Sequence, residues 1–292
     1  MQESELSEIM HTCGMPDFGV SPFDALKDRL IPCRAKRRLP DGAKSVIAAI
    51  FPYYYADAGE NSRYEISRYA WAADYHTVAG AFLARAAALL HDAYAEYRFE
   101  PFCDASPIPE VLAARLAGLG AVGQNGLLIT PRYGSFVFIG EIVTDLALSP
   151  CEKPGGSCLG CGQCLAACPA RSGLQDESGS ILACPEQCVS RLTQQKGTLT
   201  PAQRGLIKKA GFIWGCDICQ NICPMNRAPA KTNIDAFKIN VLKTLTLQQV
   251  EDDRFTDENA GRAFLWRGKA VLARNIGIVH GQEENTNGVG KI

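Results

Sequence analysis

The chain has 292 residues, of which 47% are hydrophobic and 21% are charged, and its formal net charge at pH 7 is −1. This composition is typical of a globular protein with one sizeable core and a smaller module, and it excludes a disordered or fibrous chain. A charge so close to zero does not indicate a nucleic-acid-binding protein, so any contact with nucleic acid depends on local basic patches.

The residues from Met1 to Glu5 are polar and acidic, without the apolar run that a secretory signal needs. Charged residues interrupt every apolar stretch, so we expect no membrane span and no membrane partner. The sequence contains 13 cysteines. In a long chain without an export signal they indicate bound metal in a reducing compartment rather than disulfides, and we expect a cytoplasmic protein.

Strands and helices alternate in the first half of the predicted structure. Residues 45–51 form a short apolar run before Pro52, which predicts a buried strand. Apolar residues at three- to four-residue intervals predict a helix over 77–97, and a second helix is expected over 109–116. Residues 136–148 predict a long buried strand. The order indicates a layered domain, and the predicted fold class is α+β, with a mixed α/β domain first.

Residues 150–157 are rich in glycine and proline and predict a linker into a cysteine-rich module. The predicted domains are therefore residues 1–149, residues 150–230 and a helical segment with a polar tail over 231–292. The string from Gly118 to Gly123 matches a dinucleotide-binding motif, but it follows a predicted helix rather than a strand. A dinucleotide site is therefore not expected there.

Two runs of cysteine carry the strongest chemical signal in the sequence. Steps of two, two and three intervening residues before a proline are typical of proteins with two [4Fe–4S] clusters, because three thiolates can wrap one cluster while the fourth reaches the other. Zinc also binds paired cysteines, but it seldom uses this spacing. The runs are Cys158, Cys161, Cys164 and Cys168 before Pro169, and Cys216, Cys219 and Cys223 before Pro224.

The second run is one cysteine short, because Ile213 occupies the place of a leading ligand. Cys184 and Cys188 are both candidates for the missing ligand. We favour Cys188, since the residues after it predict an ordered helical turn whereas Cys184 adjoins Pro185. The predicted ligand sets are Cys158, Cys161, Cys164 and Cys223 for one cluster, and Cys216, Cys219, Cys168 and Cys188 for the other.

Motifs outside the cysteine runs resemble the epoxyqueuosine reductase family, which is related to reductive dehalogenases. The chain departs from many members at Ala121 and Gln124, and it ends before the C-terminal helical-repeat extension that many carry, so a short form is expected. The resemblance spans about residues 40–280 and is carried by Ile66–His76, Asp104, Ala117–Gly120, Gly123–Asn125, Thr130–Ser135, Gly140–Ile142, Gly215–Gln220 and Leu272–Asn275.

The resemblance implies an enzyme that reduces epoxyqueuosine to queuosine in tRNA, with cobalamin held base-off by the first domain and electrons delivered through a ferredoxin-like module with two [4Fe–4S] clusters. It implies two partners, the anticodon stem-loop of tRNA and a low-potential donor such as ferredoxin or flavodoxin. Asp104 is implied as the catalytic proton donor. Cobalamin contacts are implied for Ser67, Arg68, Asn125, Gly134, Ser135 and Asp217.

Asp104 has a second interpretation, because Asp104-Ala105-Ser106-Pro107 precedes a predicted helix and aspartate is a common N-cap. As a proton donor at neutral pH it would need a raised pKa, which an apolar pocket provides. His76 stands at a predicted helix start. A hydrogen bond to the backbone explains this histidine at least as well as a direct role in the chemistry. His11 stands in half of a cobalamin-ligating motif whose aspartate is replaced by Ile9, so we expect no histidine on the cobalt.

Two other functions remain open at this point. The same cofactors could act on a small epoxide or an organohalide. Alternatively, the protein could be an iron–sulfur electron carrier that binds no corrin.

Overall fold

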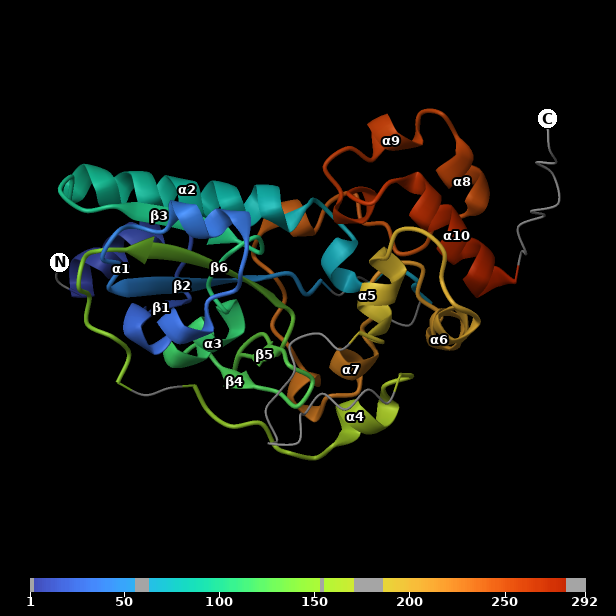
Figure 1. Cartoon of the computed structure of the whole chain (residues 1–292), viewed down its shortest axis with the longest axis horizontal. Helices are drawn as coiled ribbons and strands as arrows, with labels where there is room; N and C mark the ends of the chain where they lie inside the picture. The colour runs from blue at the N-terminus through green and yellow to red at the C-terminus, as the bar shows by residue number, and fades with distance from the viewer. Residues whose placement is uncertain (1–2, 56–62, 153–154, 171–185, 282–292) are drawn as a thin grey trace. The chain divides into compact units, whose positions relative to one another are not determined.

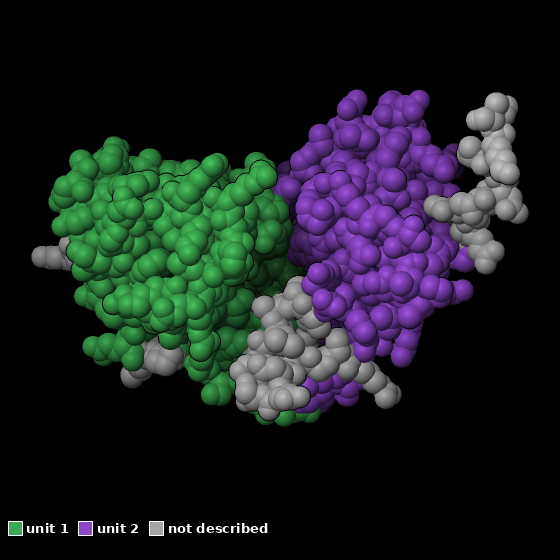
Figure 2. Space-filling view, in the orientation of Figure 1, with its two compact units in different colours: residues 1–55, 75–161, 224–236 green, residues 56–74, 162–223, 237–292 purple. Residues whose placement is uncertain are grey.

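The structure is a computed structural model that describes residues 3–55, 63–152, 155–170 and 186–281. Its contacts divide the chain into two compact units, coloured separately in Figure 2. Unit 1 comprises residues 1–55, 75–161 and 224–236, and unit 2 comprises residues 56–74, 162–223 and 237–292. The chain thus passes repeatedly from one unit to the other, and the units differ from the three consecutive domains expected from the sequence.

Unit 1 is built on a four-stranded antiparallel sheet in the order β1-β2-β6-β3 (Figure 1). The central strands are the two predicted apolar runs, although the second ends at Thr144 rather than at residue 148. The edge strands each contain a proline, which an edge tolerates because one side of the strand is unpaired. The strands are β1 (Phe18–Pro22), β2 (Ser45–Pro52), β3 (Phe99–Cys103) and β6 (Val137–Thr144).

Both predicted helices of unit 1 are confirmed with shifted ends. The first runs from Tyr75 to Ala93 and the second begins at Glu110. Gly118 follows the second with a φ of 80°, a left-handed conformation that glycine adopts without strain at helix ends. Helices and small strands of this unit are α1 (Glu3–Thr12), α2 (Tyr75–Ala93), α3 (Glu110–Leu116), β4 (Ala121–Val122) and β5 (Leu128–Ile129).

The helices α2 and α3 lie on opposite faces of the sheet. A Cβ on Gly140 of β6 would run into Leu83 of α2, so Gly140 faces α2. The preceding residue, Ile139, packs with Ala114 and Ala117 of α3. Because successive residues of a strand point to opposite faces, the odd-numbered residues of β6 face α3.

Unit 2 is made of short helices around an apolar core that includes Trp214 and Phe264. None of the helices in the described part of the chain is long and apolar enough to cross a membrane. The helices of unit 2 are α4 (Gln163–Ala167), α5 (Val189–Gln194), α6 (Pro201–Ala210), α7 (Ile218–Asn221), α8 (Leu247–Glu251), α9 (Phe255–Glu258) and α10 (Lys269–His280). The 3-10 turns of the described residues are η1 (Phe23–Ala25), η2 (Lys27–Arg29), η3 (Arg34–Arg38), η4 (Arg68–Ala70), η5 (Pro224–Asn226), η6 (Asp235–Phe237) and η7 (Ala263–Leu265).

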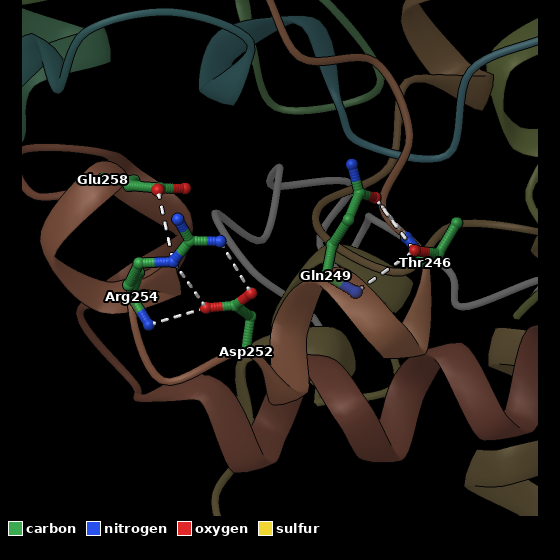
Figure 3. A network of polar contacts seen from close by, with 5 residues as sticks. All are labelled: Thr246, Gln249, Asp252, Arg254 and Glu258. Atoms are coloured by element: carbon green, nitrogen blue, oxygen red, sulfur yellow. Dashed lines mark hydrogen bonds and ion pairs between the residues drawn. The ribbon is translucent and has the colours of Figure 1, made fainter.

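Side chains fix the ends of the short helices in unit 2 (Figure 3). Thr246 and Gln249 form a capping box on α8: the Thr246 amide donates to Gln249 Oε1 at 2.8 Å, and the Gln249 amide donates to Thr246 Oγ1 at 3.2 Å. Beyond α8, Asp252 accepts the Arg254 amide at 2.9 Å and also its guanidinium, which Glu258 approaches. Helices this short gain little from their own backbone bonds, so such caps and tertiary packing hold them.

Asn275 of α10 joins three segments of unit 2 and is fully buried. Its Nδ2 donates to the carbonyl oxygens of Thr193 at 2.7 Å and Ile213 at 2.8 Å. The neighbouring Arg274 donates to the carbonyl of Gln195 at 2.7 Å. The segments that Asn275 ties to α10 are those that lead out of α5 and into the second cysteine run.

Replacing Asn275 with alanine should leave two buried carbonyls without their donor. We expect the urea midpoint of the holoprotein to fall by the equivalent of about 2–4 kcal/mol, since each lost buried bond costs about 1–2 kcal/mol. Gln248→Ala, which removes an exposed amide from α8, is the control and should shift the midpoint little. Equal shifts in the two variants would contradict the assigned role of Asn275.

Candidate active site

Asp104 lies in a tight turn immediately after β3. Its φ is 60°, in the left-handed region that aspartate tolerates better than most residues with a side chain. The turn is closed by bonds from the Ala105 amide to the Cys103 carbonyl at 2.8 Å and from the Ser106 amide to the Asp104 carbonyl at 2.5 Å. Because α3 begins only at Glu110, Asp104 is not its N-cap, and the interpretation of Asp104 as a helix cap is wrong.

The first two residues of α2 hold the Asp104 carboxylate. Tyr75 Oη donates to Asp104 Oδ2 at 2.9 Å, and His76 Nε2 lies 2.9 Å from the same oxygen. The Tyr75 ring stacks on Phe138 of β6 with centroids 4.2 Å apart and on His76 with centroids 4.0 Å apart. His76 therefore contacts the side chain of Asp104, and the aromatic stack orients Tyr75 and His76 towards this carboxylate.

These contacts determine the charge of Asp104. The hydrogen bond from His76 lowers the pKa of Asp104, and the bond from Tyr75 adds to this effect against the opposing effect of burial. The expectation of a raised pKa is therefore wrong, because hydrogen bonds to the charged form outweigh desolvation. Asp104 is ionised at neutral pH, and any proton that it donates must first reach it from a neighbouring group.

A cavity of about 280 Å³ lies beside His76 in unit 1. Arg38, Cys103 and Ala105 are among the residues that line it. Arg38 also binds Glu100 of β3, with Arg38 Nε 2.6 Å from Glu100 Oε1, so its charge is engaged within the unit. The cavity therefore borders the His76 imidazole, which contacts Asp104.

Three of the implied cobalamin contacts lie in unit 1, where each takes part in a local bond or turn. Gly134 has a φ of 59° and its missing Cβ makes room for the Asn226 side chain, so the expected turn is present. The Ser135 amide donates to Asn226 Oδ1 at 2.8 Å, and Asn226 Nδ2 donates to Ser135 Oγ at 2.8 Å. Asn125 Oδ1 accepts the Leu127 amide at 3.3 Å. Asn226, which the sequence analysis did not single out, thus binds both groups of Ser135.

The other three implied contacts come together in unit 2. The Ser67 hydroxyl donates to Asp217 Oδ1, and the Arg68 amide donates to Asp217 Oδ2 at 2.8 Å. Burial raises the pKa of Asp217, which is fully enclosed. Gly215, with a φ of 69°, packs against Ser67 where a Cβ would collide. The cluster joins the segment before η4 to the second cysteine run.

The loop of the first cysteine run has the backbone that a cluster-binding loop requires. Gly160 and Gly162 have φ values of 66° and 70°, which let the chain curl tightly between Cys158 and Cys164. The Gly160 amide lies 3.5 Å from Cys158 Sγ. No disulfide joins cysteines within the described ranges.

The cysteines of unit 2 lie near one another. The helix α4, which carries Cys164, packs against α7, which carries Cys219. Cys188 directly precedes α5, which confirms the predicted helical turn. Burial raises the pKa of Cys216 against a backbone hydrogen bond from Ile218, and Cys219, Asp217 and Cys188 raise it further, so Cys219 and Cys188 each lie near Cys216. Cys184 lies outside the described residues.

The comparisons with known proteins agree with this chemistry. The family model of the 4Fe-4S double cluster binding domain matches residues 157–226, which makes the protein an iron–sulfur protein of the double-cluster class. A second model, "Epoxyqueuosine reductase QueG, DUF1730", matches residues 34–105. The epoxyqueuosine reductase of Lactococcus garvieae is 31% identical over 300 residues, which cover 99% of this chain and 80% of that protein. The chain belongs to the epoxyqueuosine reductase family.

Solved structures show the same relationship. An epoxyqueuosine reductase in complex with an epoxyqueuosine-modified stem loop of tRNA-Tyr matches with a TM-score of 0.79 at 26% identity, over 95% of this chain and 80% of that one. A structure of the Bacillus subtilis enzyme, whose catalytic aspartate loop is swung out of the active site, matches with a TM-score of 0.78 at 26% identity, over 95% of this chain and 80% of that one.

Sequence reasoning missed the donor role of Tyr75 and two carboxylates close to Asp104. Glu141 is a single charged residue within the apolar run of β6, and Glu110 begins α3. The sequence did contain a signal for Glu141, because an acidic residue is rare inside a buried strand. Burying a carboxyl group is costly, so such a residue usually has a function.

Cys188→Ala should halve the metal content of the reconstituted protein. Eight cysteine ligands imply about eight iron and eight sulfide per chain, and loss of one ligand should release one cluster. Cys184→Ala is the matched control and should keep the full load. Iron and acid-labile sulfide analysis distinguishes the two, and the reverse result would assign Cys184 as the eighth ligand.

Proposed function

We propose that this protein reduces epoxyqueuosine to queuosine in tRNA, using two [4Fe–4S] clusters and cobalamin. The observation that carries the proposal is the Asp104 turn, in which Tyr75 and His76 hold a carboxylate at the surface of unit 1. Family membership supports the same substrate, and a relative has been solved with an epoxyqueuosine-modified stem loop.

The reaction divides the work between cofactors and protein. Removing the epoxide oxygen as water breaks two C–O bonds and consumes two electrons and two protons. Cobalamin, when bound, supplies a strongly reducing centre, and the clusters supply its electrons. The chain itself must hold the substrate, exclude competing water and deliver the protons.

Asp104 suits proton delivery. Its side chain is 57% exposed, so a substrate oxygen can approach it. Tyr75 and His76 both use Oδ2, which leaves Oδ1 without a donor among the described residues. The low pKa of Asp104 makes it a strong acid once it is protonated, which favours transfer to the alkoxide that forms when the epoxide opens.

The histidines support cobalamin without an imidazole ligand. The sequence contains four histidines, and each contacts a protein group in the structure. His11 Nδ1 lies 2.7 Å from the Ser7 carbonyl oxygen, His91 Nδ1 lies 3.2 Å from the Tyr97 carbonyl oxygen, and His280 Nε2 lies 2.9 Å from Glu65 Oε2. His76 holds Asp104. These contacts fit the base-off form expected from the sequence.

The remaining assignments extend this proposal. The clusters use Cys158, Cys161, Cys164 and Cys223, and Cys216, Cys219, Cys168 and Cys188; Ser67, Arg68, Asn125, Gly134, Ser135 and Asp217 adjoin the corrin. The electron donor is a low-potential protein such as ferredoxin or flavodoxin. A tRNA substrate and thiols kept as cluster ligands favour a cytoplasmic location.

Asp104→Asn should abolish turnover while preserving both clusters and bound cobalamin. Asparagine tolerates the left-handed conformation, but its amide cannot supply an acidic proton, so we expect kcat to fall about 10²- to 10⁴-fold. The control is Asp41→Asn, an exposed aspartate distant in sequence from the turn. Substantial activity in Asp104→Asn would remove Asp104 from the mechanism.

Substrate choice is tested with epoxyqueuosine-containing tRNA, its anticodon stem-loop and the free nucleoside. We expect the stem-loop to be reduced nearly as well as whole tRNA, with binding that weakens as salt rises because phosphates are contacted. If the wild-type holoenzyme turns over none of the three, the proposed function is wrong, and a small epoxide or organohalide becomes the substrate to test.

Bound cob(II)alamin should give an electron paramagnetic resonance spectrum without nitrogen superhyperfine splitting. The reason is that the histidine motif of cobalamin ligation is incomplete in this chain, with Ile9 in place of its aspartate. His11→Ala should leave this spectrum unchanged. A split signal that disappears in His11→Ala would instead identify His11 as a cobalt ligand.

A further inference from the structure

Glu141 is a fully buried carboxylate in the middle of β6. It is 0% exposed, and among the described residues neither carboxylate oxygen has a hydrogen-bond partner of normal geometry, although the Ser106 hydroxyl is close enough to favour its ionised form. An ionised carboxylate without partners is very costly to bury, so such a group is normally protonated or serves a function. Glu141 has no part in the mechanism described so far.

The surroundings of Glu141 are apolar. Its neighbours across the sheet are Ala48 of β2 and Phe102 of β3, and both are buried. Ile139 and Val143 flank it on the same face and pack beneath α3. Glu141 therefore stands between two apolar clusters on the α3 side of the sheet.

The strand register places Glu141 close to the Asp104 turn. Gly140 pairs with Cys103, the last residue of β3, and Asp104 follows directly. Ser106, at the end of the turn, is itself buried and lies close enough to favour the ionised form of Glu141 slightly. Glu110 begins α3 a few residues later, so a short segment joins Asp104 to Glu110, and the pairing of β6 with β3 brings Glu141 close to that segment.

Glu110 and Glu141 both bind protons more tightly than ordinary glutamates. Burial raises the pKa of Glu110 to about 8, the charge of Asp104 raises it as well, and His76 opposes this. Burial raises the pKa of Glu141 well above its usual range, and the charge of Glu110 is the next cause. Both residues are therefore mainly protonated at neutral pH.

The titratable groups around this pair come from three elements. They are His76 of α2, Asp104 after β3, and Glu110 of α3 itself. The β2 residue opposite Glu141 is Ala48, and no residue of β2 titrates. Asp104 and His76 are thus the titratable groups that act on this pair of glutamates.

The chemistry of the proposed reaction requires such a store of protons. Each turnover consumes two protons, whereas Asp104 carries one at most and is ionised at rest. When both C–O bonds have broken, the oxygen leaves as water and both protons are in it. A second proton donor must therefore lie within reach of Asp104.

We propose that Glu141, which is buried, and Glu110, which is half-buried at the start of α3, form a proton store that reloads Asp104 during each turnover. The inference rests on the proposed function. Glu110 passes its proton towards the pair formed by Asp104 and His76, and Glu141 then reprotonates Glu110. Only O–H and N–H bonds form and break in these transfers, and the two electrons come from the clusters and cobalamin. The transfer is driven by the substrate oxygen, which becomes far more basic than a carboxylate as the epoxide opens.

Infrared difference spectroscopy of the wild-type holoprotein tests the store without any turnover. Between about pH 6 and about pH 9, the carbonyl band of a protonated carboxylic acid should decrease as Glu110 loses its proton. Glu110→Gln should remove this change, and Glu141→Gln should remove the acid band that remains in Glu110→Gln at about pH 6. Glu100→Gln, on the same strand as Phe102 but ion-paired with Arg38, should leave both bands unchanged.

The pH dependence of folding gives a second measurement. The folded state keeps a proton on Glu110 that the unfolded state loses between about pH 4.5 and about pH 8, so stability falls as pH rises through this window. Glu110→Gln should fold, because an amide resembles the protonated acid, and its unfolding midpoint should decline less with pH. A midpoint that declines as steeply as in the wild type would overturn the protonated state assigned to Glu110.

Steady-state kinetics distinguish a proton store from a purely structural role of Glu110 and Glu141. Glu110→Gln and Glu141→Gln should keep clusters, cobalamin and KM but lower kcat at least about tenfold, and Glu110→Gln should lose the alkaline decline of kcat. Glu100→Gln should retain the wild-type kcat and its alkaline decline. Unchanged kcat in both store variants, or absence of the acid bands, would overturn the proposal. If the wild type shows the acid bands but reduces no epoxyqueuosine substrate, the proposed function is wrong. The protonated state of Glu110 and Glu141 would still be confirmed.

Discussion

The pairing of β6 with β3 is the constraint on which the catalytic side of the molecule depends. The ladder ends where Gly140 meets Cys103, and the next residue of the shorter strand is Asp104. On one face of β6, Phe138 supports the Tyr75 ring that donates to Asp104. On the other face, Glu141 reaches beneath α3. A slip of one residue in this register would exchange the two faces, and the aromatic support and the buried acid would both be misplaced.

Unit 2 is not organised around a sheet as unit 1 is. In its described residues the helices are short and there is almost no sheet. Buried polar side chains replace long elements as the organising contacts. Asn275 ties α10 to α5, which follows Cys188, and to the segment before the second cysteine run, and Asp217 ties Ser67 to that run. Buried polar groups are costly when unpaired and specific when satisfied, so these contacts select one arrangement of loops around the ligands. Several motif residues that suggested cofactor contacts therefore have a structural role in the described chain.

Patterns with local causes could be predicted from the sequence, and contacts between distant residues could not. The apolar runs of β2 and β6 and the helical periodicity of α2 depend on neighbouring residues, and the cysteine spacing reflects the geometry of one loop. The strand β3 was missed because Pro101 interrupts its pattern, which only its place at the sheet edge explains. The low pKa of Asp104 arises from Tyr75 and His76 at the start of α2, which lie far from Asp104 in the sequence. Asn226 became meaningful only once its bonds to Ser135 were known.

The left-handed backbone of Asp104 links its protonation to the shape of its loop. A non-glycine residue in this region costs about 1–2 kcal/mol, and the bonds from Tyr75 and His76 to the charged carboxylate offset that cost. Protonation weakens these bonds, so it leaves the backbone cost less well compensated. The contacts of this turn are therefore strongest when Asp104 is charged, and the catalytic carboxyl is held least firmly when it carries the proton that it is to donate.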